Sequence, residues 1–198
     1  MITDKDRIIL RHIEKYKFIT LEEARLIAFP DMKRGYEYVR TRLQRLVKIE
    51  KRLRIITNTA LKLKLFIDID ADAKKIPNSP HRIYLMDFYC RLIAAGAKIE
   101  KFDLERQWMN RTLRSDALII YEYGGGFRFR NLVEVNKSNN TLDLDRFDAA
   151  KDEIIHACEG FAPSIILIDD RTHKNYTTKI YTVIRLDYNL KNFPEIFL

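Results

Sequence analysis

The chain has 198 residues, 46% of them apolar, with 36 Lys and Arg against 28 Asp and Glu, for a net charge of +8. This length and composition suit one sizeable hydrophobic core or two small ones, and they exclude a disordered or low-complexity chain. No apolar run approaches the ~20 residues of a membrane-spanning helix, and the start lacks the pattern of a secretory signal, so we expect a cytoplasmic protein with no membrane partner.

Three amphipathic helices are predicted before residue 49. Thr3 caps the first helix, and Thr20 with Glu23 has the spacing of a capping box that begins the second. The third helix is expected over residues 33–48. Its periodicity places five apolar side chains on the inward face: Tyr36, Val39, Leu43, Leu46 and Val47.

Two extended segments follow, at residues 52–57 and 60–68, joined at Asn58 and Thr59. Three helices with a short second one, followed by a basic hairpin, is the order of a winged helix-turn-helix. Residues 68–80 then lose all periodicity and contain three acids and two prolines. We therefore predict that residues 1–76 form a winged helix-turn-helix DNA-binding domain and that a second domain occupies residues 77–198.

The charge excess belongs entirely to the first part of the chain. Residues 1–80 carry 19 basic and 11 acidic side chains, whereas residues 81–198 carry 17 of each. This partition predicts that double-stranded DNA is the partner of the first domain alone. Long basic side chains suit phosphates, and Tyr38, Thr41 and Gln44 suit base edges. The candidate DNA-binding residues are Arg34, Tyr38, Arg40, Thr41, Arg42, Gln44, Arg45 and Lys48 on the third helix and Lys51, Arg52, Arg54, Lys62 and Lys64 on the hairpin.

The second half of the sequence predicts a mixed α/β domain with a central sheet. The expected elements are a helix at 82–95, strands at 99–108, 117–123 and 127–135, a helix at 142–158, and strands at 164–168 and 179–186. The turn of three glycines at 124–126 joins the second and third strands as a hairpin. The whole chain is therefore expected to have an α+β fold.

Two carboxylates on this predicted hairpin suggest a nuclease-like site. Asp116 precedes one strand and Glu134 lies on its partner, as in the restriction-endonuclease-like core, where two carboxylates hold Mg²⁺ and a lysine orients water. Lys137 points to the other face, and Asn136 stands on the face of Glu134. Only Lys151, on the following helix, could supply the missing charge. We therefore expect a degenerate, inactive nuclease-like domain, with Mg²⁺ required only if the nuclease alternative holds and no other cofactor or metal.

Six different short motifs are spaced along the chain between residues 2 and 135. They occupy residues 2–10, 18–24, 40–46, 81–87, 114–118 and 132–135. Together they resemble landmarks of the plasmid replication-relaxation family. The resemblance implies a winged helix-turn-helix followed by a restriction-endonuclease-like domain, in a protein that binds the DNA of a plasmid or integrative element during replication, relaxation or conjugative transfer.

Three functions follow as hypotheses. The first is a sequence-specific DNA-binding accessory protein whose second domain forms a homodimer or docks a relaxase or replication protein. The second is a metal-dependent DNA nuclease that uses Asp116 and Glu134. The third is a transcriptional repressor whose second domain serves oligomerisation or ligand binding.

Overall fold

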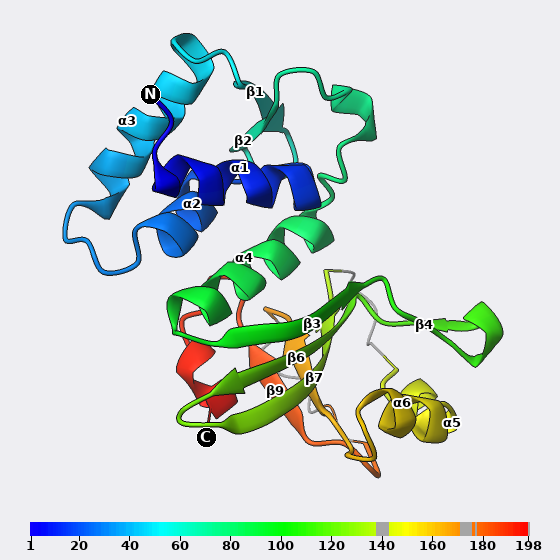
Figure 1. Cartoon of the computed structure of the whole chain (residues 1–198). Coiled ribbons are helices and arrows are strands. Elements are labelled where there is room, and N and C mark those ends of the chain that lie inside the picture. Colours follow the sequence, from blue (N-terminus) through cyan, green and yellow to red (C-terminus); the bar gives the residue numbers. More distant parts are fainter. Residues whose placement is uncertain (138–142, 171–175, 177, 198) are drawn as a thin grey trace. The chain divides into compact units, whose positions relative to one another are not determined.

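The structure is a computed structural model, and it describes residues 1–137, 143–170, 176 and 178–197. It divides the chain into two compact units, Met1–Ala95 and Gly96–Leu198. The described residues have a mixed α+β fold with six α-helices and one five-stranded mixed sheet (Figure 1). None of the described helices is long and apolar enough to cross a membrane.

The N-terminal unit consists of three helices, a hairpin and a fourth helix. In chain order its elements are α1 (Asp4–Tyr16), α2 (Leu21–Ala28), α3 (Gly35–Lys48), β1 (Leu53–Asn58), β2 (Leu63–Asp68), the 3-10 helix η1 (Ala73–Lys75) and α4 (Pro80–Ala94). Thr3 and Thr20 cap α1 and α2, and in both helices the third residue, Asp6 or Glu23, accepts from the backbone of the cap. The predicted helix starts are confirmed.

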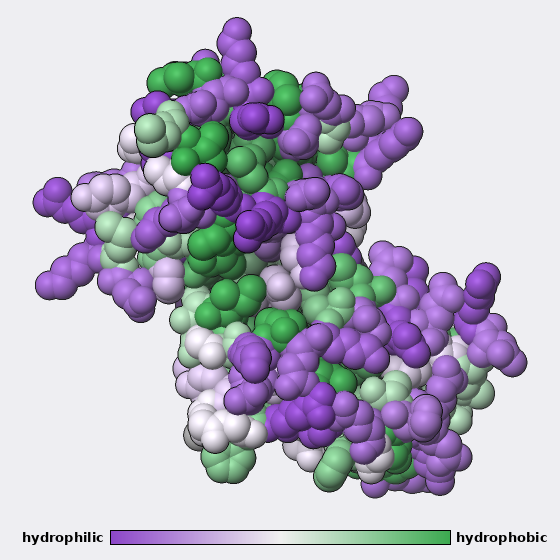
Figure 2. All heavy atoms as spheres, viewed as in Figure 1, coloured by the Kyte–Doolittle hydropathy of each residue, from purple (hydrophilic) through white to green (hydrophobic). Residues whose placement is uncertain are grey.

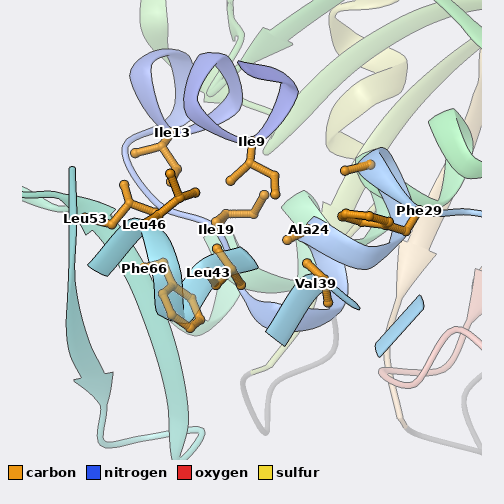
Figure 3. Close-up of a cluster of buried hydrophobic side chains, with 11 residues drawn as sticks. Ile9, Ile13, Ile19, Ala24, Phe29, Val39, Leu43, Leu46, Leu53 and Phe66 are labelled. Atoms are coloured by element: carbon orange, nitrogen blue, oxygen red, sulfur yellow. The ribbon is translucent and has the colours of Figure 1, made fainter. Parts of the chain in front are cut away.

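One apolar cluster holds α1, α2, α3 and the hairpin together (Figure 3). On α3 its members Val39, Leu43 and Leu46 are spaced four and three residues apart and are fully buried. Each such side chain contributes about 1.5–3 kcal/mol through its burial. Burial of this apolar face therefore determines which side chains of α3 face outward.

The segment that follows the hairpin packs back on the hairpin. Arg54 donates to the carbonyl of Ala71, and Asn58 donates to the carbonyl of Asn78. Leu65 and Ile67 of β2 are fully buried. This segment therefore belongs to the N-terminal unit, although its composition predicted a domain boundary within it.

The unit boundary lies after Ala95, beyond the predicted boundary at residue 76. Ser79 caps α4, and Pro80 stands in its first turn. This helix packs against α2, so it is part of the N-terminal unit and not the first helix of the second unit. With this boundary, the N-terminal unit has 21 basic and 12 acidic residues and the C-terminal unit has 15 and 16.

The C-terminal unit is built on a sheet with the strand order β3-β6-β7-β8-β9. Its described elements are β3 (Lys98–Leu104), β4 (Gln107–Trp108), η2 (Met109–Arg111), β5 (Leu113–Arg114), β6 (Ala117–Tyr123), β7 (Phe127–Val135), α5 (Arg146–Ala149), α6 (Lys151–Ala157), β8 (Ser164–Ile168), β9 (Val183–Leu186) and η3 (Phe193–Phe197). Strands β3, β6 and β7 are antiparallel neighbours, and β8 and β9 continue the sheet in parallel with β7. The three glycines between β6 and β7 all have positive φ, which suits a tight hairpin turn.

Three predicted elements of this unit differ in the structure. The strand expected at 179–186 begins only at Val183, as β9. The helix expected at 142–158 is two short helices, because the backbone at Ala150 leaves the helical region; Leu142 lies outside the described residues. The strand expected at 99–108 ends at Leu104, and a small two-stranded arm of β4 and β5 follows it.

His12 and Glu23 of the N-terminal unit are buried and have strongly shifted pKa values. Burial, with the charges of Lys15 and Arg82, lowers the pKa of His12 to about 4. Burial raises the pKa of Glu23 to about 8, against the hydrogen bond from the Thr20 backbone. In the unfolded chain the pKa of Glu23 is 4.5. Below this pH Glu23 makes its full contribution to the unfolding free energy, and the contribution is lost as the pH rises to 8. The contribution of His12 to the unfolding free energy changes with pH in the opposite direction, because it is complete above pH 6.5 and is lost as the pH falls to 4.

We expect the two effects to offset each other between pH 4.5 and 6.5, so that the unfolding free energy of the N-terminal unit falls mainly between 6.5 and 8. The slope should approach about 1.4 kcal/mol per pH unit. Chemical unfolding monitored by circular dichroism over this range measures it. Glu23→Gln should abolish the part of the fall that comes from Glu23 and leave the part that comes from Glu134 of the C-terminal unit, whose pKa is also raised to about 8. His12→Phe should move the onset of the fall towards pH 4.5. A wild-type profile that is flat from 6.5 to 8 would contradict the assignment to Glu23.

Candidate functional site

Helix α3 presents a polar outward face between its basic ends. Tyr38, Thr41 and Gln44 lie on this face and are exposed, and Tyr38 keeps 51% of its surface accessible. Within the described part of the chain, none of their side chains has a hydrogen bond or ion pair. Arg34, Arg40 and Lys48, which are exposed and equally without a side-chain partner there, flank them. Figure 2 shows hydrophilic side chains over much of the visible surface of the N-terminal unit.

The start of α3 lies close to the end of α2. A side-chain carbon added to Gly35 would come within 3.1 Å of the Phe29 carbonyl oxygen. Tyr36, which the periodicity placed inward, is instead 51% exposed. The guanidinium of Arg25 lies over its ring, 5.9 Å from the ring centroid. A contact with Arg25 of α2, rather than the apolar core, is therefore what Tyr36 makes in the first turn of α3.

Arg42 is engaged inside the unit. Its guanidinium forms a double hydrogen bond with Asp6 of α1, with Nε 2.9 Å from Oδ1. Asp6 is fully buried and also accepts from the backbone and hydroxyl of Thr3. Burial opposes the charge on Asp6, but the hydrogen bonds from Arg42 and Thr3 outweigh it and lower the pKa of Asp6. Arg42 thus links α1 to α3.

Two other predicted DNA-binding arginines also have partners. Arg45 contacts Glu50, with Nε 3.2 Å from Oε1, and the same oxygen accepts from the amino group of Met1. Arg54 is bonded to the Ala71 carbonyl. All three arginines are among the DNA-binding residues predicted from the sequence, which did not reveal these acceptors.

The tip of the hairpin carries exposed cations. Lys62 and Lys64 are exposed near the turn, and Asn58 Oδ1 shapes that turn by accepting from the backbone of Leu61 at 2.8 Å. Lys51 and Arg52, between α3 and β1, are exposed as well. Of the predicted phosphate-contacting residues, those with no side-chain partner in the described chain are Arg34, Arg40, Lys48, Lys51, Arg52, Lys62 and Lys64.

The structure also brings together the two predicted carboxylates of the C-terminal unit. Asp116 Oδ2 accepts from the backbone of Val135 at 2.7 Å, and Glu134 Oε1 accepts from the backbone of Asp116 at 3.2 Å. Glu134 Oε2 accepts from Arg146 at 2.9 Å. Burial and the charge of Asp116 raise the pKa of Glu134 to about 8, and Arg146 opposes the shift. Among the described residues, no hydrogen bond or ion pair joins Lys151, which is exposed, to either carboxylate.

This arrangement does not fit a divalent cation. Mg²⁺ takes ionised, accessible oxygen ligands, whereas Glu134 is only 5% exposed and both of its oxygens are engaged. Over the described ranges, no three His, Cys, Asp or Glu side chains gather as a metal-binding group. Arg146, which the sequence did not single out, supplies the positive charge beside Glu134.

Asn136 has a structural partner at the end of the neighbouring strand. Its amide donates to Asp169 Oδ2 at 3.3 Å and to the Tyr176 hydroxyl at 3.2 Å, and Tyr176 donates to the same Asp169 oxygen at 2.7 Å. Both Asn136 and Asp169 are buried. Asn136, which stands on the face where the nuclease hypothesis requires a lysine, therefore joins the ends of β7 and β8.

Comparison of the chain with protein-family models, with curated proteins and with solved structures finds no match.

Proposed function

We propose that the chain is a sequence-specific double-stranded DNA-binding protein whose N-terminal unit is a winged helix-turn-helix. The observation that carries the proposal is the outward face of α3, where Tyr38, Thr41 and Gln44 are exposed without partners between free cations. A helix that enters the major groove needs short polar groups at its centre and long donors around them. The basic charge of this unit and the exposed lysines of the hairpin tip support the same reading.

We further propose that the C-terminal unit is a degenerate restriction-endonuclease-like domain. Its order of three antiparallel strands, two helices and a parallel strand supports this reading, as does the pairing of Asp116 with Glu134. The Glu134–Arg146 pair favours a role without metal-dependent cleavage. In this proposal the unit docks a relaxase or replication protein, or a second copy of the chain.

The biological setting that we propose is the one that the family resemblance implies. The protein would act in the cytoplasm as an accessory factor in the replication, relaxation or conjugative transfer of a plasmid or integrative element. Its motifs at residues 2–10, 40–46 and 114–118 support this setting.

Titration of the full chain against a short fluorescent duplex tests the DNA-binding proposal. Arg40→Ala and Lys48→Ala should each weaken binding by roughly fivefold to tenfold near 0.1 M salt, the loss expected for one phosphate contact. Lys151→Ala, which removes the same charge from the C-terminal unit, is the matched control and should leave the affinity unchanged. Equal losses in all three variants, or no binding by the wild type, would reject the proposal.

A further inference from the structure

We propose that Glu37 recognises cytosine, so that the DNA site selected by α3 contains a C·G pair at one defined position. This inference rests on the proposed function, because it names a base that the same helix would select. Glu37 is exposed, and it is the one acidic residue in the sequence of α3. In the major groove, a glutamate carboxylate accepts a hydrogen bond from the N4 amino group of cytosine.

Glu37 lies at the centre of the outward face of α3. The inward direction is set by Val39, Leu43 and Leu46, which are buried in the apolar cluster (Figure 3). At about 100° per residue, Glu37 lies within about 30° of the opposite direction, in line with Thr41 one turn later. Glu37 also belongs to the first turn of α3. The N-terminal residues of a recognition helix are those that contact base edges, so this position suits a base contact.

Helix capping does not account for Glu37. In α1 and α2 the third residue, Asp6 or Glu23, accepts a hydrogen bond from the backbone of the cap residue. Glu37 is the third residue of α3, but the cap there is Arg34, which makes no side-chain capping bond. Among the described residues, no hydrogen bond or ion pair holds the Glu37 carboxylate, although Arg34 and Arg40 stand three residues before and after it. Its acceptor oxygens are therefore available to a ligand.

The charge of Glu37 makes it selective among the four bases. A carboxylate beside DNA repels the phosphates, so it lowers the affinity unless a base offers it a donor. Guanine presents only acceptors in the major groove, and thymine presents an acceptor and a methyl group. Adenine presents its N6 donor next to the N7 acceptor, whereas cytosine presents the N4 donor alone. Glu37 is thus expected to favour cytosine and to disfavour the other three bases at the same position.

Selection of bound duplexes from a random-sequence pool by the full chain tests this inference. The expected result is one position at which cytosine is preferred by about tenfold over the other bases, the discrimination of one good base contact. Glu37→Gln keeps the size of the side chain and should replace cytosine by adenine at that position, because a glutamine amide pairs with N6 and N7 of adenine. Glu37→Ala should abolish the preference and raise the affinity for duplexes that lack this cytosine.

Glu14→Gln is the matched control for the loss of a negative charge. Glu14 is exposed on α1, so this variant should keep the cytosine preference of the wild type. A wild type without a cytosine preference, or a preference that survives Glu37→Ala, would overturn the assignment while leaving DNA binding in place. Loss of the preference in Glu14→Gln would overturn it as well. Absence of binding to every duplex in the pool would instead reject the proposed function itself.

Discussion

Replacement of Arg42 by alanine should destabilise the N-terminal unit by about 3–5 kcal/mol, the cost of leaving a buried charge without its partner. Asp6 is fully buried, and Arg42 provides two of its hydrogen bonds. The hydrogen bonds from Thr3 to Asp6 remain in the variant, so we expect a value near the lower limit. Urea unfolding monitored by far-ultraviolet circular dichroism measures the change.

Arg40→Ala is the matched control for this prediction. Arg40 stands two residues earlier on the same helix and is exposed, so its removal should change stability by less than about 0.5 kcal/mol. Comparison of the two variants therefore distinguishes a structural role from a DNA-binding role. If Arg42→Ala left stability unchanged but weakened DNA binding as Arg40→Ala does, Arg42 would be a DNA contact and its pairing with Asp6 incidental.

Replacement of Arg146 by alanine should destabilise the C-terminal unit, by about 3 kcal/mol above pH 8 and by less at lower pH. Arg146 favours the ionised form of Glu134, whose pKa burial raises to about 8 from 4.5. Without Arg146, the carboxyl avoids an unpaired buried charge by keeping its proton, and that protection is lost as pH rises. Thermal unfolding of the variant and the wild type at pH values on both sides of 8 measures the difference.

Glu134→Gln combined with Arg146→Ala is the control for the second prediction. The double variant has no buried charge at this position, so the pH dependence of the loss should disappear and most of the stability should return. Mg²⁺ should not stabilise Arg146→Ala, because Glu134 and Asp116 alone do not form a metal site. Stabilisation by Mg²⁺ that disappears with Glu134→Gln, together with Mg²⁺-dependent nicking of supercoiled plasmid, would instead support the nuclease alternative.

Much of the fold could be predicted from local patterns. The capping residues Thr3 and Thr20 mark helix starts because their side chains satisfy free backbone amides. Strands β6, β7 and β8 have the predicted bounds, since runs of apolar residues end at glycines or polar residues. The break at Ala150 could not be predicted, because buried residues Phe147, Ala150 and Ile154 keep a helical spacing across it.

The candidate sites were predicted less completely, because the contacts of their side chains are made with residues that lie far away in the sequence. The burial of Val39, Leu43 and Leu46 confirms the inward face of α3 and hence the exposure of the opposite face. Asp6 and Arg42 are 36 residues apart, and no local pattern indicates that they meet. Likewise, the spacing of Asp116 and Glu134 on a hairpin predicted their proximity, but Arg146 comes from a helix whose position depends on the packing of the whole unit.

The salt dependence of DNA binding by the full chain is the most direct test of the central claim. Each neutralised phosphate lowers log K by about 0.9 per tenfold increase in salt, so the predicted phosphate-contacting cations without a partner, on α3, before β1 and on the hairpin, predict a slope of about −6. Arg40→Ala with Lys48→Ala should reduce that slope by about 2. A slope near zero, or one that only Lys151→Ala reduces, would contradict binding of DNA by the N-terminal unit.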